Sequence, residues 1–332
     1  MNLKGKNILV SIILPFKNEE KYIVECVNSI IAQSSKNWEL ILVDDHSSDR
    51  STMYAKEFTT SDLRIRYFLN PGTGVIDALK EGFKQSTGSL ITRMDGDDIK
   101  TPDNIEQLIE LTSKGVIGVG KVEYFREGGV GEGYKKYATW MNQLTRTNQN
   151  FTEIYKECVI PSPCWMCTRE DFIACGGFDS TLYPEDYDLC FRFYGAGLKT
   201  NGSKSVIHYW RDHEIRTTRT SAHYSDNRFL DLKTFYFLKL DFNQSRNLIL
   251  WGAGKKAKVM AKIFINQGVD FMWLTDNHKK IGHNIYGVIL SDSRKYIPKR
   301  EDQIVIAVSD KSGSNDIHAI TSSNNVKPLW FC

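Results

Sequence analysis

The sequence predicts an α/β protein with a mostly parallel sheet between helices, followed by a second, smaller α/β domain. Apolar, β-branched runs alternate with amphipathic segments over roughly the first 115 residues, as in a chain that alternates strand and helix. A second alternation of the same kind begins near residue 244. We therefore place the first domain at residues 1–243 and the second at residues 244–332.

The elements of the first domain can be assigned in order. The run NILVSIILPF is continuous and apolar, as in a strand buried on both faces, and Asn18 is the expected cap of the helix that follows it. Thr101 is the expected cap of a later helix, with Pro102 in its first position. Glycines 128, 129, 131 and 133 indicate a mobile loop. Further strands are predicted at 38–45, 63–70 and 88–95, and further helices at 75–86, 184–197 and 229–242.

The second domain begins with NLILWGAGKKA, which reads as strand, glycine turn and helix. Two more apolar runs, VDFMWLTD and QIVIAVSD, are predicted to be further strands. Only about 85 residues are present, which is within the normal size range of a small domain.

Composition narrows the class of protein. Of the 332 residues, 41% are hydrophobic and 25% are charged, which is ordinary for a globular protein. The net charge of +3 gives no argument for binding nucleic acid, and no apolar run is long enough to span a bilayer. The seven cysteines indicate no disulfide framework, and the spacing around Cys164 and Cys167 matches no common zinc finger. We therefore expect a cytoplasmic protein without a transmembrane segment. Peripheral attachment at the inner face of the membrane and homo-oligomer formation stay open.

Polar and acidic residues follow three of the predicted strands. Because ligands of parallel sheets bind at the carboxyl ends of the strands, these residues are expected to lie at one edge. Asp95 and Asp97 suit a hard cation, Mn²⁺ or Mg²⁺, which would offset the charge of a departing diphosphate. The alternative is a capped loop before a helix, where acids are common. The other two strand ends contribute Pro15, Phe16, Asn18 and Glu19, and Asp44 and Asp45.

Three segments together resemble family 2 glycosyltransferases, whose nucleotide-sugar domain has the GT-A fold. They are SIILPFKNEEKYIVECVNSIIAQSSKNWELILVDDHSSDRST, GSLITRMDGDDIKTPDNIEQ and GGFDSTLYPEDYDLCFRFYGAG, and the similarity extends from about residue 9 to residue 221. The resemblance implies an inverting enzyme that moves a sugar from a nucleoside-diphosphate sugar, with UDP expected, to a hydroxyl of a glycan or lipid-linked sugar. It also implies a role in cell-surface polysaccharide synthesis.

The resemblance also implies roles for individual residues. Asp97 is expected to be the more direct metal ligand of the D-x-D pair that it forms with Asp95, and His213 a further ligand. Asp44 is expected to contact the base and Asp45 the ribose, next to the first nucleotide-binding turn of Pro15, Phe16, Asn18 and Glu19. The diphosphate is expected to meet basic residues, for which the chain offers Lys80, Arg93, Arg211, Arg216 and Arg219.

Glu185 and Asp186 match the family's Glu-Asp pair, whose aspartate is the expected catalytic base. The chemistry agrees, because inverting transfer needs a carboxylate to accept the proton of the attacking hydroxyl. Asp186 follows Pro184 in the first turn of a predicted helix, where the helix N-terminus favours the ionised form, so we expect it to be deprotonated at pH 7. The alternative is that these acids only begin the helix.

The second domain carries a G-x-G-x-x-A pattern at Gly252, Gly254 and Ala257, with Asp276 at the end of the next strand. Dinucleotide-binding sites have this arrangement of a strand, a glycine turn, a helix and an acid after the next strand. However, no further domain remains to hold an oxidisable substrate. We therefore favour a Rossmann-like module that serves packing, dimerisation or acceptor placement.

Three other activities stay open. A metal-dependent nucleotidyltransferase would share the acidic strand ends but would not need Asp186. An NAD(P)-binding oxidoreductase would use the second domain. A non-catalytic module would bind sugar nucleotides only.

Overall fold

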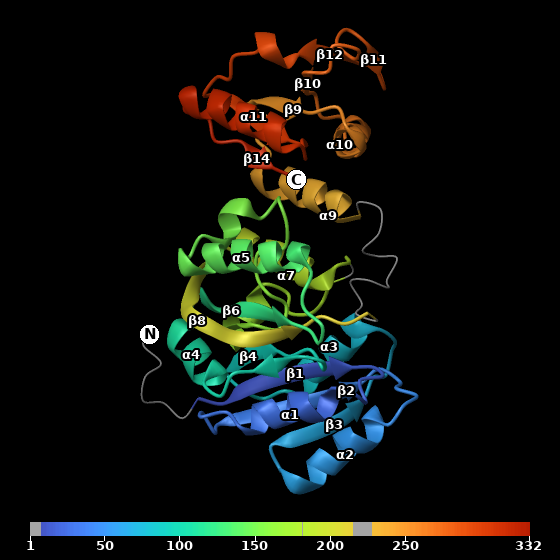
Figure 1. The fold of residues 1–332 in the computed structure, drawn as a ribbon, viewed down its shortest axis with the longest axis vertical. Helices are drawn as coiled ribbons and strands as arrows, with labels where there is room; N and C mark the ends of the chain where they lie inside the picture. Colours follow the sequence, from blue (N-terminus) through green and yellow to red (C-terminus); the bar gives the residue numbers. More distant parts are fainter. Residues whose placement is uncertain (1–7, 181, 215–227) are drawn as a thin grey trace. The chain divides into compact units, whose positions relative to one another are not determined.

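The computed structural model describes residues 8–180, 182–214 and 228–332. The chain divides into two compact units (Figure 1). The first comprises Met1–Thr152 and Cys158–Arg219, and the second comprises Glu153–Glu157 and Thr220–Cys332. The α/β architecture predicted from the sequence is confirmed.

The first unit contains an eight-stranded sheet in the order β3-β2-β1-β4-β7-β6-β8-β5. The strands β3, β2, β1 and β4 are parallel, as predicted, but β7 is antiparallel to both of its neighbours and β5 is antiparallel to β8. The strands are β1 (Val10–Phe16), β2 (Trp38–Asp44), β3 (Ile65–Leu69), β4 (Leu90–Arg93), β5 (Ile99–Lys100), β6 (Val116–Phe125), β7 (Trp165–Thr168) and β8 (Lys199–Arg211).

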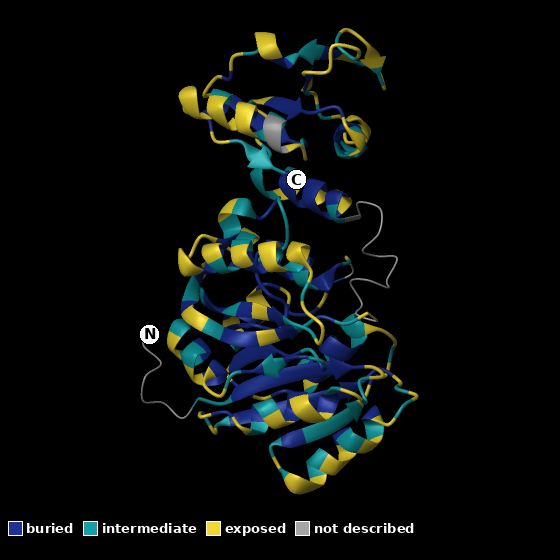
Figure 2. Cartoon of the chain, in the orientation of Figure 1, coloured by how far each residue is buried: buried dark blue, intermediate teal, exposed yellow. Residues whose placement is uncertain are grey.

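Helices cover both faces of this sheet. Alternate residues of β1 and β2 point to opposite faces. Ile12 and Leu14 belong to one buried cluster with residues of α1 and α4, whereas Ile41 and Val43 pack with Ala78 of α3. Figure 2 shows the resulting buried residues along the central strands. The helices are α1 (Ile23–Ile31), α2 (Ser51–Ser61), α3 (Val75–Gln85), α4 (Asn104–Leu111), α5 (Glu132–Arg146), α6 (Arg169–Ala174) and α7 (Glu185–Gly195), with a 3₁₀ turn, η1, at Asn150–Glu153.

Two predicted helix caps are wrong. Helix α1 has Tyr22 at its N-cap position, and Asn18 instead adopts a φ of 57° and binds the loop after β2. Helix α4 has Asp103 at its N-cap position. Thr101 precedes it because its backbone N–H donates to Ile207 of β8, which extends the pairing between β5 and β8.

The glycine-rich stretch is only partly a loop. Gly128 and Gly129 have positive φ values in a turn after β6, but Glu132 already begins the fifteen-residue helix α5. Ala138 and Met141 of this helix are buried in the main cluster of the first unit. The apolar spacing in YKKYATWMNQL was a helix signal that the neighbouring glycines obscured.

The second unit contains a six-stranded sheet in the order β11-β12-β10-β9-β13-β14. All neighbours are parallel except β11 and β12, and the five parallel strands follow the order 3-2-1-4-5 of doubly wound sheets. The strands are β9 (Asn247–Trp251), β10 (Met272–Thr275), β11 (Asn284–Ile285), β12 (Val288–Asp292), β13 (Asp302–Ile306) and β14 (Leu329–Trp330). The helices are α9 (Arg228–Tyr236), α10 (Lys255–Asn266) and α11 (Lys311–Ser323), with a π-helical turn, η3, at Phe237–Asp241 and a 3₁₀ turn, η4, at Ser293–Lys295.

Helix α9 groups with the second unit, whereas the sequence placed the domain boundary after it, between residues 243 and 244. The physical reason is aromatic packing. Phe237, directly after α9, is fully buried, and its ring lies 6.1 Å from that of Phe264 and 6.0 Å from those of Phe331 and Tyr155.

Candidate active site

The three acidic strand ends of the first unit come together. The backbone N–H of Asp45, after β2, donates to the carbonyl of Phe16 at the end of β1, at 2.8 Å. Asn18 binds the same loop through Ser47, and Met94, after β4, donates to Ile13 of β1 at 3.0 Å. Parallel pairing of β2, β1 and β4 therefore places all three loops at one edge of the sheet.

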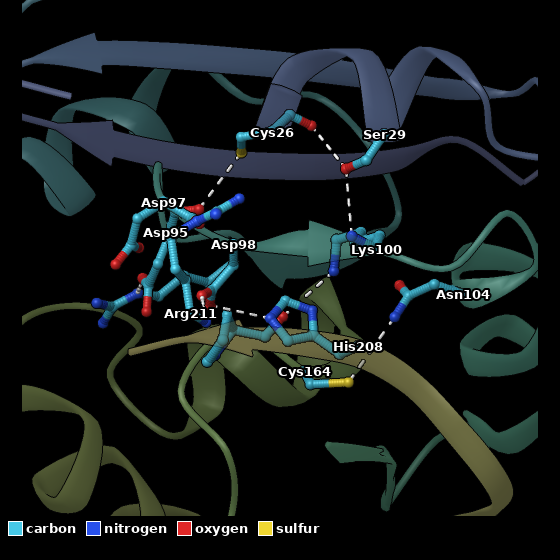
Figure 3. Close-up of polar contacts among 12 residues, drawn as sticks. Cys26, Ser29, Asp95, Asp97, Asp98, Lys100, Asn104, Cys164, His208 and Arg211 are labelled. Carbon is cyan, nitrogen blue, oxygen red and sulfur yellow. Dashed lines mark hydrogen bonds and ion pairs between the residues drawn. The ribbon is translucent and has the colours of Figure 1, made fainter. Parts of the chain in front are cut away.

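The loop after β4 holds the carboxylates of the D-x-D pair in different environments. Asp97 Oδ2 lies 2.9 Å from His213 Nε2, and Asp95 Oδ1 accepts from Arg93 Nε at 2.9 Å. Burial, together with the nearby charges of Asp97 and Asp95, raises the pKa of Glu19 to about 9. This edge of the sheet therefore has an excess of negative charge that a cation would relieve. Figure 3 shows the loop and its neighbours.

The donor set suits a hard cation that also takes ligands from a substrate. In the part of the chain that the structure describes, no three side chains of His, Cys, Asp or Glu gather closely enough to hold a metal by themselves. Asp97 and His213 do face one another, and His213 Nδ1 is buried without a hydrogen-bond partner among the described residues. The Asp97 carboxylate suits Mn²⁺ or Mg²⁺, which prefer oxygen ligands and commonly complete their coordination with phosphate oxygens and water, and the His213 nitrogen lies beside it.

Arg93 joins the D-x-D loop to the predicted catalytic pair. Its guanidinium binds Asp95 through Nε and Glu185 Oε1 through Nη1, the latter at 2.8 Å. The side chains of Arg93 and Glu185 are only 10% and 8% exposed, so this ion pair is well shielded from water. Asp186 is the next residue, at the start of α7. The pair Asp95 and Asp97 and the pair Glu185 and Asp186 therefore border one site, although they lie about ninety residues apart in sequence.

The environment of Asp186 differs from the sequence-based expectation. Burial and the neighbouring Glu185 carboxylate raise the pKa of Asp186 to about 7, although Arg93 and the Tyr187 N–H oppose this shift. Burial therefore outweighs the helix N-terminus, which we expected to keep Asp186 ionised. A pKa close to the working pH is the value that suits a general base.

For a reaction that uses the ionised Asp186 carboxylate as its base, we expect kcat/KM to rise with pH through about 7 and then level off. At pH 6 it should be about a tenth of its plateau value, the ionised fraction one unit below the pKa. The same shift makes ionisation of Asp186 costly to the fold, so its contribution to stability falls as the pH rises from 3.8 to about 7. A pH profile of kcat/KM at saturating metal checks the prediction, and a profile that is flat from pH 5.5 to 8.5 would contradict it.

The two predicted nucleotide acids are already bound within the protein. Asp44 is 1% exposed, and its carboxylate accepts from Ser47 N at 2.8 Å, from Tyr67 at 3.1 Å and from the Thr52 hydroxyl. These hydrogen bonds outweigh burial and lower its pKa. The Asp45 carboxylate accepts from Asn70 Nδ2, at 2.7 Å, and from Gly74 N, at 2.8 Å. Both acids shape the loops of the edge, and their contact with a base or ribose stays a prediction.

The predicted phosphate-binding cations also have partners. Lys80 lies 3.1 Å from Asp179, and the guanidinium of Arg93 is shared by two carboxylates. Arg211 donates from Nε to the carbonyl of Asp97 at 2.7 Å, and its guanidinium lies between the rings of Tyr22 and Phe125. Arg211 thus supports the acidic loop. Arg216 and Arg219 lie outside the described residues.

The second unit places its glycine motif as the sequence predicts. Gly252 follows β9 with a φ of 119°, and a Cβ there would lie 2.7 Å from the Ala307 carbonyl oxygen, so glycine is required. Gly254 is at the N-cap position of α10, and Asp276 directly follows the neighbouring strand β10. Lys280 Nζ donates to the Ala253 carbonyl at 2.7 Å. Ligand binding at this turn stays a prediction.

Sequence reasoning missed the buried partners of the acidic loop. Asp98, the third acid of the loop, has no role assigned from the sequence, and His208 and Lys100 were not singled out. All three are at most 2% exposed. The available signal for His208 was weak, because it is a single polar residue within the apolar strand sequence SVIHYW.

A separate finding concerns membranes. None of the helices in the described ranges combines the length and the apolar character that are needed to cross a bilayer.

A sheet with clustered acids at the carboxyl ends of its inner parallel strands, joined to an acidic helix start, has the architecture of the GT-A fold. Comparison with known proteins agrees. The chain superposes with a TM-score of 0.54 on S. aureus TarS 1-349, solved with UDP-GlcNAc, at 18% identity over 78% of this chain and 72% of that one. A mannosyltransferase from Pyrobaculum calidifontis, solved with GDP-Man and Mn²⁺, gives a TM-score of 0.51 at 16% identity, over 69% of this chain and 63% of that one.

The chain belongs to glycosyl transferase family 2, whose sequence profile matches residues 11–176. An uncharacterized glycosyltransferase of Haemophilus influenzae is 34% identical over 275 residues, which are 77% of this chain and 84% of the relative. The Streptococcus pneumoniae glycosyltransferase GlyA matches over a shorter stretch, at 34% identity over 36% of this chain, and the chain spans 17% of that protein. The resemblance identified from the sequence is thus confirmed, and the protein is a glycosyltransferase.

Proposed function

We propose that this glycosyltransferase transfers a sugar, with inversion, from a nucleoside-diphosphate sugar to a hydroxyl of a glycan or lipid-linked sugar. The observation that carries the proposal is the bridge of Arg93 between Asp95 and Glu185, which joins a cation-binding edge to a candidate base. The structural neighbours bound to UDP-GlcNAc and to GDP-Man support a nucleotide-sugar donor. We favour UDP because Asp44 matches the acid with which members of this family contact the base, which is usually uracil.

A divalent ion belongs to the same proposal. Asp97 and His213 would hold it, and the ion would offset the negative charge that develops on the leaving diphosphate. The Mn²⁺ bound to the Pyrobaculum calidifontis enzyme supports this choice of cofactor. Arg93 keeps the Asp95 carboxylate turned toward the catalytic pair, so that Asp97 is the acid left to face His213.

Asp186 would act as the general base. The acceptor oxygen attacks the anomeric carbon from the side opposite the diphosphate, and the carbon–oxygen bond to the diphosphate breaks with its electron pair. The acceptor proton passes to the Asp186 carboxylate, whose pKa of about 7 suits that transfer. The ion pair with Arg93 holds Glu185 in place, and the Tyr187 N–H donates to Asp186 Oδ1 at 2.8 Å, which orients the base.

The test is nucleotide release from a panel of UDP- and GDP-sugars, measured with and without Mn²⁺ and with candidate acceptors. Metal-dependent release that an acceptor stimulates supports the proposal. Incorporation of a sugar phosphate into a nucleotide, with release of pyrophosphate, would instead favour a nucleotidyltransferase. Binding of a nicotinamide cofactor that Asp276→Arg weakens would favour an oxidoreductase activity of the second unit. Synthesis of surface polysaccharide at the cytoplasmic face of the membrane is the setting that the family resemblance suggests.

A further inference from the structure

The third acid of the loop, Asp98, is turned toward the interior of the first unit. It is fully buried, and its Oδ2 lies 2.9 Å from Nε2 of His208, which is also fully buried (Figure 3). Its Oδ1 accepts from the backbone N–H of Arg211 at 2.8 Å. A carboxylate without access to solvent cannot reach a substrate, so Asp98 has a different task from Asp95 and Asp97.

Strand β8 and the residues directly after it contact the acidic loop at three successive points. His208 binds the Asp98 side chain, and Arg211 binds both the Asp98 side chain and the Asp97 carbonyl. His213, two residues beyond Arg211, then faces the Asp97 side chain. The antiparallel pairing of Ile99 with Tyr209 and of Lys100 with His208 lies directly beside these contacts.

The contact between Asp98 and His208 is a hydrogen bond between two fully buried side chains. Burial, together with the nearby Lys100 charge, lowers the pKa of His208 well below its ordinary value, so the imidazole is neutral. A single hydrogen bond joins Nε2 of this neutral ring to Oδ2 of Asp98. His208 Nδ1 has no hydrogen-bond partner among the described residues. The bond to Asp98 is therefore the polar contact that fixes the orientation of the ring.

We infer that Asp98 and His208 are positioning residues, which lock the register between the acidic loop and the end of β8 and so set His213 against Asp97. The inference rests on the proposed function, because it takes Asp97 and His213 as the residues that hold the metal. Without the buried bond, the backbone of Arg211 loses its fixed acceptor, and His213 loses its fixed distance from Asp97. Removal of partners that orient metal ligands typically weakens metal affinity about 10- to 100-fold.

Three variants separate positioning from general stability. His208→Leu removes the donor, whereas His208→Gln keeps an N–H near the position of Nε2. Ile207→Ala is the matched control, because Ile207 is a fully buried neighbour on β8 whose side chain belongs to the apolar cluster. Mn²⁺ affinity is measured on the full chain with UDP present, by the electron paramagnetic resonance signal of free Mn²⁺, and Tm is measured in parallel.

We expect His208→Leu to weaken Mn²⁺ binding about tenfold or more, and His208→Gln to restore most of it. Ile207→Ala should lower Tm without changing Mn²⁺ affinity. If His208→Leu does not fold, the double variant D98N/H208L leaves no carboxylate buried without its donor, and the same loss of affinity is expected.

Equal Mn²⁺ affinity in the wild type and His208→Leu would overturn the inference, as would an equal loss in Ile207→Ala. Asp97→Ala separates this failure from that of the proposed function. If Asp97→Ala loses its affinity for Mn²⁺ and His208→Leu keeps it, only the positioning role of His208 is contradicted. If the wild type binds no Mn²⁺, or Asp97→Ala binds it equally well, both proposals fall.

Discussion

Asp186→Asn should lower kcat for sugar transfer by about 10²- to 10⁴-fold, the usual contribution of a general base, and leave donor binding intact. The amide has almost the shape of the carboxylate but cannot accept the proton of the attacking hydroxyl. The Tyr187 N–H can still donate to the amide oxygen, so the start of α7 should keep its conformation. Acceptor-stimulated nucleotide release and the Kd for the donor, measured together, check the prediction.

Asp188→Asn is the matched control for this variant. Asp188 lies on the same helix and is buried, but its carboxylate binds Arg192 at 2.8 Å and does not line the pocket beside Asp186. Its substitution should lower Tm and leave kcat largely unchanged. An Asp186→Asn enzyme with wild-type kcat would exclude Asp186 as the base, and an equal fall of kcat in both variants would point to a structural effect.

Asp97→Ala should abolish the metal dependence of nucleotide release and lower the rate by about 10³-fold, since a metal supplies several kcal/mol to a developing charge. The expected loss is large because Asp97 is the acid that faces His213, whereas the Asp95 carboxylate is held by Arg93. Without the cation, the charge that develops on the leaving diphosphate is not offset. Release rates are measured after treatment with a chelator and again after addition of Mn²⁺.

Asp103→Ala provides the comparison for Asp97→Ala. Asp103 lies shortly after the acidic loop, but its carboxylate accepts from Thr101 and Gln107 at the start of α4. This variant should keep the response to Mn²⁺. Full restoration of Asp97→Ala by added Mn²⁺ at the wild-type concentration would show that Asp97 does not hold the metal.

The parallel half of the first sheet could be predicted because its strands are buried on both faces. Such strands read as unbroken apolar runs, and their polar carboxyl ends identified the edge where the loops of Asn18, Asp45 and Asp97 meet. The strands β7 and β8 were missed. They pair antiparallel to distant segments or with an irregular register, so their sequences carry no comparable pattern.

The acids of the candidate site could be predicted from the sequence, but the residues that bind them could not. A short motif marks Asp95, Asp97 and Asp186, but which cation neutralises which acid depends on contacts between residues far apart in sequence. Arg93 and Arg211 are held by carboxylates and by the loop backbone, and their contact with a phosphate stays a prediction. The pKa of Asp186 likewise depends on burial, which a helix-start pattern does not report.

The pairing of β5 with β8 has a consequence for how the enzyme is made. The contacts of Asp98 with His208 and of Asp97 with His213 join residues that are 110 and 116 positions apart. During synthesis, the acidic loop therefore emerges long before the residues that complete it, and closing such a long loop is slow relative to local folding. A chain that stopped at residue 176, where the family profile ends, would carry the aspartates of the loop but neither histidine nor Asp186. On the proposed function, competence for transfer is thus acquired late, after β8 has been synthesised.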